Sequence, residues 1–292
     1  SKRLGRKLEA YDIWYDGFKA RSNLDENKLN EQTRTLYPDA VTMEKKLPEI
    51  LQKLGFSPDR AQYLADKIAV DPARGSGHAW GASMKGQRSR LRTRIPSQGM
   101  DYKGYNIAIH EFGHNVEQTI SLYDVDYYML NGVPNTAFTE ALAFVFQKRD
   151  LELLGIWSMY EICGVSMLDI SVWKWMYAHP NATAGELQEA VIRLSKEIWN
   201  KYYAPVFGVK DETVLAIYSH MIGYPLYLSA YAFGQIIEFQ LENYLNGKDF
   251  ANEVSRIFKQ GRLTPNVWIK QATGNDLTVD PMLEALRKVL KD

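Results

Sequence analysis

Apolar residues recur every three or four positions along most of the chain, a spacing that predicts a mainly helical protein. Helices are expected over 8–20, 41–54, 57–69, 185–203, 211–219 and 281–290. No internal repeat and no low-complexity linker divides the sequence. One compact unit is therefore the simplest expectation for its organisation.

The pattern changes between Arg74 and Pro96. Residues 77–84 are rich in glycine and small side chains, and Lys85-Gly86-Gln87 is suited to a turn. From Arg88 to Ile95 the arginines then alternate with smaller or apolar residues, which is the period of a strand. The sequence predicts a β-hairpin with a basic outer face. Two interpretations of these arginines stay open, a solvated strand face and a binding surface for an acidic ligand.

A stretch without charged residues runs from Val214 to Ile237 and is long enough to cross a bilayer. It contains His220, Pro225, Gln235 and four tyrosines, however, and aromatic hydroxyl groups prefer the membrane interface to its apolar centre. A buried pair of helices lining a polar cavity explains the same composition. We expect no membrane span.

Composition limits the classes of partner. The chain has 292 residues, 46% of them apolar, and Lys plus Arg and Asp plus Glu both number 35. Zero net charge gives no reason to expect a nucleic acid or another polyanion. The single cysteine, Cys163, is compatible with a reducing compartment such as the cytoplasm, and also with a secreted protein that has no disulfides. The chain starts at Ser1 and shows no signal peptide, so it is compatible with a trimmed piece of something longer.

The most specific pattern is His110-Glu111-Phe112-Gly113-His114. On a helix, residues four apart lie on one face, so the two imidazoles can bind one cation. Glu111 follows the first ligand directly and can reach a water on the metal without coordinating the metal itself. The spacing predicts a zinc site on a helix. The alternative is a pair of core histidines satisfied by hydrogen bonds.

A catalytic zinc ion needs a third protein ligand and an open position. No third histidine follows at short spacing, so a carboxylate from a second helix is expected. Asn135 is a suitable cap for a helix from Ala137 to Leu154 that stops at Gly155. Glu140 lies on the apolar face of that helix, where a carboxylate is costly unless it meets a cation. We therefore expect His110, His114 and Glu140 to hold one Zn²⁺. Other acids are expected at the surface or as groups that orient the ligands: Glu117, Asp124, Asp126 and Asp150.

These motifs resemble the zinc peptidase family of thimet oligopeptidase and oligoendopeptidase F. Phe138-Thr139-Glu140-Ala141 resembles the stretch that carries the family's glutamate ligand, and Gly81-Ala82 resembles its strand beside the substrate. The resemblance implies a helical, gluzincin-type catalytic domain with a small β-hairpin or sheet beside the active site. It implies one catalytic domain over 1–292 that lacks part of the family's larger N-terminal helical region, which leaves substrate size open.

The resemblance extends to a late segment in which a histidine and tyrosines face the scissile carbonyl. By position it implies catalytic roles for His220, Tyr224 and Tyr231, while a third family tyrosine is replaced by Leu228 or by a shifted Tyr227. A phenol donates a hydrogen bond without adding charge, which suits a developing oxyanion. The alternative is that these tyrosines are core residues at helical spacing.

Together these observations predict a metalloendopeptidase, or oligopeptidase, that hydrolyses peptide bonds in oligopeptides. Glu111 would take a proton from the attacking water and pass it to the leaving amine. The expected partner is a peptide substrate. Two alternatives belong to other classes: an inactive metal- and peptide-binding protein of the same fold, and a helical structural or membrane-associated module in which the histidines are only core residues.

Overall fold

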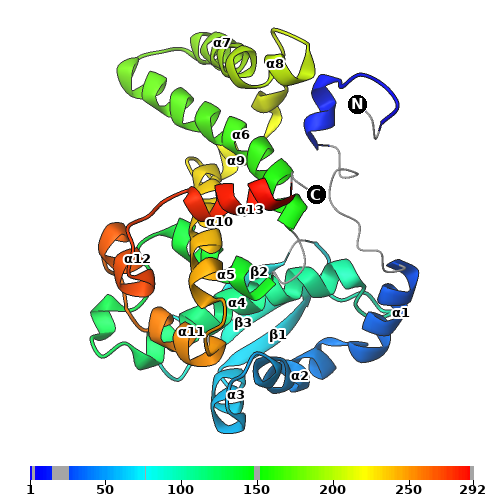
Figure 1. Ribbon diagram of the computed structural model, residues 1–292, viewed down its shortest axis with the longest axis vertical. Helices are drawn as coiled ribbons and strands as arrows, with labels where there is room; N and C mark the ends of the chain where they lie inside the picture. The colour runs from blue at the N-terminus through cyan, green and yellow to red at the C-terminus, as the bar shows by residue number, and fades with distance from the viewer. Residues whose placement is uncertain (2–3, 15–25, 76, 148–151, 290–292) are drawn as a thin grey trace. The chain divides into compact units, whose positions relative to one another are not determined.

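The protein is mainly α-helical with one small β-sheet, as the sequence predicts (Figure 1). The computed structural model describes residues 1, 4–14, 26–75, 77–147 and 152–289. The chain divides into two compact units, each described by itself. Unit 1 comprises 1–20, 151–233 and 286–292, and unit 2 comprises 21–150 and 234–285. The expectation of one catalytic domain stays a prediction.

Unit 2 contains the sheet and most of the shorter helices. Its elements are α1 (Glu26–Leu36), α2 (Ala40–Lys53), α3 (Pro58–Ala65), β1 (Ile68–Ala73), β2 (His78–Trp80), β3 (Ser89–Arg94), α4 (Tyr102–Asp124), η3 (Tyr128–Leu130), α5 (Thr136–Gln147), α11 (Phe250–Phe258) and α12 (Pro265–Thr273).

Unit 1 contains the two long helices α6 and α7. Its elements are η1 (Ala10–Trp14), α6 (Glu152–Ala178), α7 (Ala184–Tyr202), α8 (Ala204–Phe207), η4 (Val214–Ile217) and α9 (His220–Gly223). Two helices have residues in both units: α10 (Leu228–Leu245) and α13 (Asp280–Val289).

The sheet has the strand order β1-β3-β2. The predicted hairpin is confirmed, because β2 pairs antiparallel with β3. The expected helix over 57–69 is wrong at its end: α3 stops at Ala65, and Ile68 begins strand β1, which pairs parallel with β3. Ile68, Ala69 and Val70 are all buried. Such a continuous buried run suits a covered strand better than a one-sided helix.

The arginines of the hairpin are largely neutralised by carboxylates of neighbouring elements. Arg88 donates to Glu44 at 2.6 Å, and Arg90 makes two bonds to Asp71 at 2.7 and 2.9 Å. Arg94 donates to Asp101 at 2.5 Å, and the guanidinium of Arg92 lies 5.1 Å from the ring centroid of Trp80. The basic face is therefore an internally paired surface, which favours the solvated-strand interpretation.

Helix α4 is the central element of unit 2, where it packs against both β3 and α5. Its N-terminus is capped by Asp101, whose carboxylate accepts a hydrogen bond from Gly104 N at 2.7 Å. Phe112, Val116 and Ile120 are fully buried. These three residues lie four positions apart and form one apolar face of the helix. The adjacent face can therefore carry polar side chains.

Helices α4 and α5 approach closely at Gly113. A Cβ atom at this position would lie 2.9 Å from Phe146 Cβ and 3.0 Å from Ala143 Cα. Only a hydrogen fits in that space, so the glycine sets the distance between the two helices.

The helix predicted from Ala137 to Leu154 is wrong at its C-terminal end. Its start is as expected, because Asn135 Oδ1 accepts a hydrogen bond from Ala137 N at 3.0 Å. Helix α5 is described from Thr136 to Gln147, residues 148–151 lie outside the described part of the chain, and Gly155 lies inside α6 rather than at a stop. A glycine inside a helix costs only about 1 kcal/mol relative to alanine, so packing can override it.

Unit 1 has its own core around α6 and α7. Trp199 and Leu215 are fully buried there, and Tyr203 is 1% exposed. The helix expected over 211–219 is only the 3₁₀ turn η4, and Asp211 has a left-handed backbone with φ 61°. The charge-free stretch is divided among η4, α9 and α10. Among the described helices, none combines the length and apolar character needed to span a membrane.

Replacing Gly113 with alanine should destabilise the protein. The added methyl group must push α5 away, and such overpacking costs about 1–3 kcal/mol, more than the gain in helix propensity of about 1 kcal/mol. Thermal and urea unfolding measure the loss. Gly185→Ala is the control, since that helical glycine has no neighbouring atom closer than 4.0 Å. Equal stability of Gly113→Ala and wild type would contradict the packing argument.

Candidate metal centre

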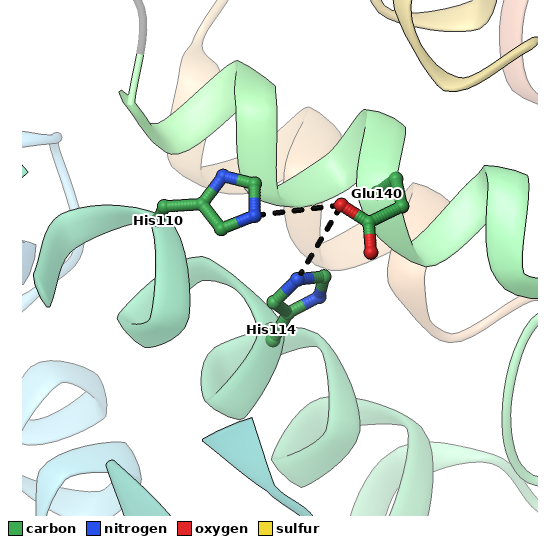
Figure 2. A group of neighbouring side chains, drawn as sticks. All are labelled: His110, His114 and Glu140. Carbon is green, nitrogen blue, oxygen red and sulfur yellow. Dashed lines mark ion pairs between the residues drawn. The ribbon is translucent and has the colours of Figure 1, made fainter. Parts of the chain in front are cut away.

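The two histidines of α4 and the glutamate of α5 converge on one point (Figure 2). Glu140 Oε2 lies 3.5 Å from His110 Nε2 and 3.9 Å from His114 Nε2. One ligand atom from each of the three residues lies within 4.8 Å of the others. Within the described part of the chain, this is the one group of His, Cys, Asp or Glu side chains arranged to hold a metal ion.

The buried side chains of His114 and Glu140 carry a net negative charge that a bound cation would balance. His114 is 8% exposed and Glu140 is 3% exposed. Burial, with a smaller contribution from His110, lowers the pKa of His114 to about 4, so this imidazole is neutral at pH 7. Its contact with Glu140 is then not an ion pair. A buried carboxylate beside a neutral imidazole is stabilised by a bound metal ion, which the donor set fits.

Both imidazoles use their other nitrogen to hold their orientation. His110 Nδ1 lies 3.0 Å from Gln147 Oε1, and His114 Nδ1 lies 2.9 Å from Thr139 Oγ1. Gln147 and Thr139 lie on α5, the helix that supplies Glu140. An imidazole that donates from Nδ1 keeps the lone pair of Nε2 for a metal. Both Nε2 atoms face the carboxylate of Glu140, as a shared ion requires.

Close packing also fixes the backbone beneath Glu140. A Cβ atom at Gly234 of α10 would lie 2.9 Å from Glu140 Cβ and 3.1 Å from the carbonyl oxygen of Ala137. Helix α10 therefore rests directly on the turn of α5 that carries the ligand, which restricts movement of the carboxylate.

Glu111 lies where strand β2 crosses α4. A Cβ atom at Gly77 would lie 3.0 Å from Glu111 Cγ, so the chain that leads into β2 packs directly against this side chain. Burial raises the pKa of this carboxyl to about 7, although His110 acts in the opposite direction. A carboxyl group with a pKa near neutrality is suited to accept and return a proton.

The remaining acids have different environments. Glu117 is 2% exposed, and burial raises its pKa to about 7, while Thr139 and the charge of Arg262 act to lower it. Asp124 forms an ion pair with Arg60. Asp126 is exposed. Asp150 lies outside the described residues.

The histidine and tyrosines of the late segment form an aromatic cluster in unit 1. The ring of His220 lies 6.1 Å from that of Tyr224 and 6.5 Å from that of Tyr231, and Tyr227 lies 5.3 Å from Tyr231. Leu228 is buried, whereas Tyr224 is 66% exposed and thus not a core residue. The candidate metal ligands His110, His114 and Glu140 belong to unit 2. The catalytic roles of His220, Tyr224 and Tyr231 therefore stay predictions.

The two side chains of α5 that orient the imidazoles were not predicted from sequence. Thr139 and Gln147 look like ordinary polar positions of an amphipathic helix. Glu117 was among the acids expected at the surface or as groups that orient the ligands, and the structure buries it beside Thr139.

No protein-family model matches the sequence, and no curated protein matches it. Solved structures do share its fold. PZ peptidase A with a bound inhibitor is 17% identical, with a TM-score of 0.56 over 99% of this chain and 58% of that protein. A protein described as an oligoendopeptidase F from Bacillus anthracis is 12% identical, with a TM-score of 0.55 over 99% of this chain and 60% of that one.

A carboxypeptidase has a similar fold. Trypanosoma cruzi metallocarboxypeptidase 1 is 14% identical, with a TM-score of 0.54 over 97% of this chain and 72% of that protein. The chain thus spans less than two thirds of the first two neighbours. At such identities the similarity shows a shared fold, that of helical gluzincin-type peptidases.

Removing one ligand should abolish tight metal binding. His114→Ala should weaken the affinity for Zn²⁺ by more than about 100-fold, because loss of a ligand exceeds the 10–100-fold cost typical of groups that only orient one. Competition with a chromophoric chelator measures the affinity, and elemental analysis measures the metal content. His179→Ala, an exposed histidine of unit 1, is the control. Unchanged affinity in His114→Ala would refute the assigned ligand set.

Proposed function

We propose that the protein is a zinc metallopeptidase that hydrolyses peptide bonds in oligopeptides. The observation that carries this proposal is the convergence of His110, His114 and Glu140 on one point, with Glu111 one residue from the first ligand. Two imidazoles and one carboxylate, with a fourth position left open, form the donor set of a catalytic zinc site.

One ion would be held by Nε2 of both histidines and by the carboxylate of Glu140. A bound Zn²⁺ supplies Lewis acidity, which lowers the pKa of a coordinated water and polarises a carbonyl group. The protein residues keep this chemistry in place: Gln147 and Thr139 hold the rings, and burial protects the ligands from competing water.

Glu111 is the proposed general base and acid. Its carboxylate accepts the proton of the attacking water and later donates it to the nitrogen of the leaving amine. The close approach of Gly77 holds this side chain beside β2. A raised pKa lets the same group take up and release the proton near neutral pH.

The peptide would lie along β2. This strand is at one end of the sheet order, so in the described sheet it has a pairing partner on one side only. An extended peptide can add to such an edge through main-chain hydrogen bonds. Gly81, directly after β2, packs against Gln118 of α4, which keeps the strand close to the metal-binding helix. Tyr231, with Tyr224 or His220, is proposed to stabilise the oxyanion.

The structural neighbours support the choice of reaction. They include a PZ peptidase, a protein described as an oligoendopeptidase F and a metallocarboxypeptidase. All three names denote peptidases, although they differ in whether cleavage is internal or terminal. Internal cleavage of oligopeptides is our finer proposal, which rests on the resemblance of residues 138–141 and of the 110–114 motif to thimet oligopeptidase and oligoendopeptidase F.

Glu111→Gln should retain zinc and lose turnover. The amide keeps the shape of the side chain but cannot take up the proton, so kcat should fall by about 10²–10⁴-fold, the usual contribution of a general base. A library of internally quenched peptides, with elemental analysis of the same samples, provides both readouts. Glu197→Gln, on the surface of α7, should match wild type. Peptide binding without hydrolysis by the wild type would instead identify an inactive binding protein.

Tyr231→Phe should lower kcat with little change in metal content. Loss of one oxyanion donor typically costs about 10²–10³-fold in kcat. Tyr224→Phe and Tyr227→Phe identify the phenol that acts, and Tyr177→Phe, an exposed tyrosine of α6, is the control. If all three variants of the cluster turn over at the wild-type rate, the cluster has no role in the reaction.

A further inference from the structure

Glu117 is a buried carboxyl group that the proposed reaction does not use. It lies on α4 one turn after His114 and is 2% exposed. Its Oε2 accepts a hydrogen bond from Thr139 Oγ1 at 3.1 Å, and the same Oγ1 lies 2.9 Å from His114 Nδ1. Three side chains thus form a continuous chain from the protein interior to a metal ligand.

The proton of the Thr139 hydroxyl determines which group donates and which accepts in these two hydrogen bonds. A hydroxyl group has one proton to donate. When Glu117 is ionised it can only accept, so Thr139 donates that proton to Glu117 and the Thr139 oxygen can only accept from His114. Nδ1 of His114 must therefore carry the ring proton, and Nε2 keeps its lone pair. Nε2 is the atom that faces Glu140.

We propose that Glu117 acts through Thr139 as a positioning group that fixes the tautomer and orientation of His114 and so sets the metal affinity. A ligand imidazole backed by a carboxylate becomes more basic at the nitrogen that binds the metal. Thr139 precedes Glu140 in sequence, so one turn of α5 supplies both a ligand and the bridge that orients another. This inference deepens the proposed zinc site and rests on it.

His110 provides an internal comparison. Its Nδ1 also has an acceptor, Gln147 Oε1, but Gln147 is the last residue of α5 and is only half-buried. Among the described residues, the amide of Gln147 makes no hydrogen bond to a charged group. His114 is therefore the more strongly preorganised of the two imidazole ligands.

The experiment uses Thr139→Val, which keeps the shape of the side chain and removes the hydroxyl, and Thr139→Ser, which restores it. We expect Thr139→Val to weaken Zn²⁺ binding by about 10–100-fold in chelator competition, the usual cost of losing a group that orients a ligand, and Thr139→Ser to recover most of it. Thermal unfolding of the metal-free proteins reports any general loss of stability.

A second readout does not depend on metal. In ¹⁵N-edited NMR spectra of the metal-free protein, the signal that disappears in His114→Ala reports the ring of His114. Wild type should show the proton on Nδ1, and Thr139→Val should shift it toward Nε2. A purely structural role for Thr139 would not move the tautomer.

A double-mutant cycle tests whether Glu117 acts through the hydroxyl. Glu117→Met should weaken metal binding in the wild-type background and have no further effect in Thr139→Val. Retention of the Nδ1 tautomer and of wild-type affinity in Thr139→Val would overturn the proposal, and so would a loss of affinity that Thr139→Ser does not recover. If wild type binds no metal, the proposed zinc site is wrong. The tautomer measurement would still show which nitrogen of His114 carries the proton.

Discussion

A carboxylate buried beside a neutral imidazole is the constraint on which the rest of unit 2 depends. Glu140 is almost inaccessible to solvent, and burial keeps His114 uncharged at neutral pH. Desolvating a carboxylate without a compensating charge costs several kcal/mol. A metal ion shared by the three side chains would offset that cost. Metal binding and the stability of the α4–α5 pair would then be coupled.

The backbone around the site is built for close contact. Gly113 lets α5 approach α4, and Gly234 lets α10 approach the turn of α5 that carries Glu140. At each of these positions a methyl group would push apart two helices that pack at the site. Because a metal site tolerates errors of only a few tenths of an ångström in ligand position, these contacts matter more for geometry than for apolar burial.

Most of the correct predictions from the sequence came from residue patterns within a single helix or hairpin. The spacing of His110 and His114 is a property of one helix, and Glu140 stood out as an acid on an apolar face. Strand β1 was missed because its stability comes from pairing with β3, a partner distant in sequence. Thr139 was missed for a similar reason. Its hydroxyl contacts His114 and Glu117 only because α5 packs against α4 in one particular register. The sequence pattern of a single helix does not predict that register.

Strand β2 links the chemistry to the sheet. Gly77 and Gly81 bring its backbone against α4, where a Cβ atom at Gly77 would lie 3.0 Å from Glu111 Cγ and one at Gly81 would lie 3.2 Å from the amide of Gln118. The strand that holds the proposed general base is also the edge strand available to a peptide. A substrate that pairs with β2 would therefore be placed by the same backbone that places the base, so the distance between them depends on one short strand rather than on flexible side chains.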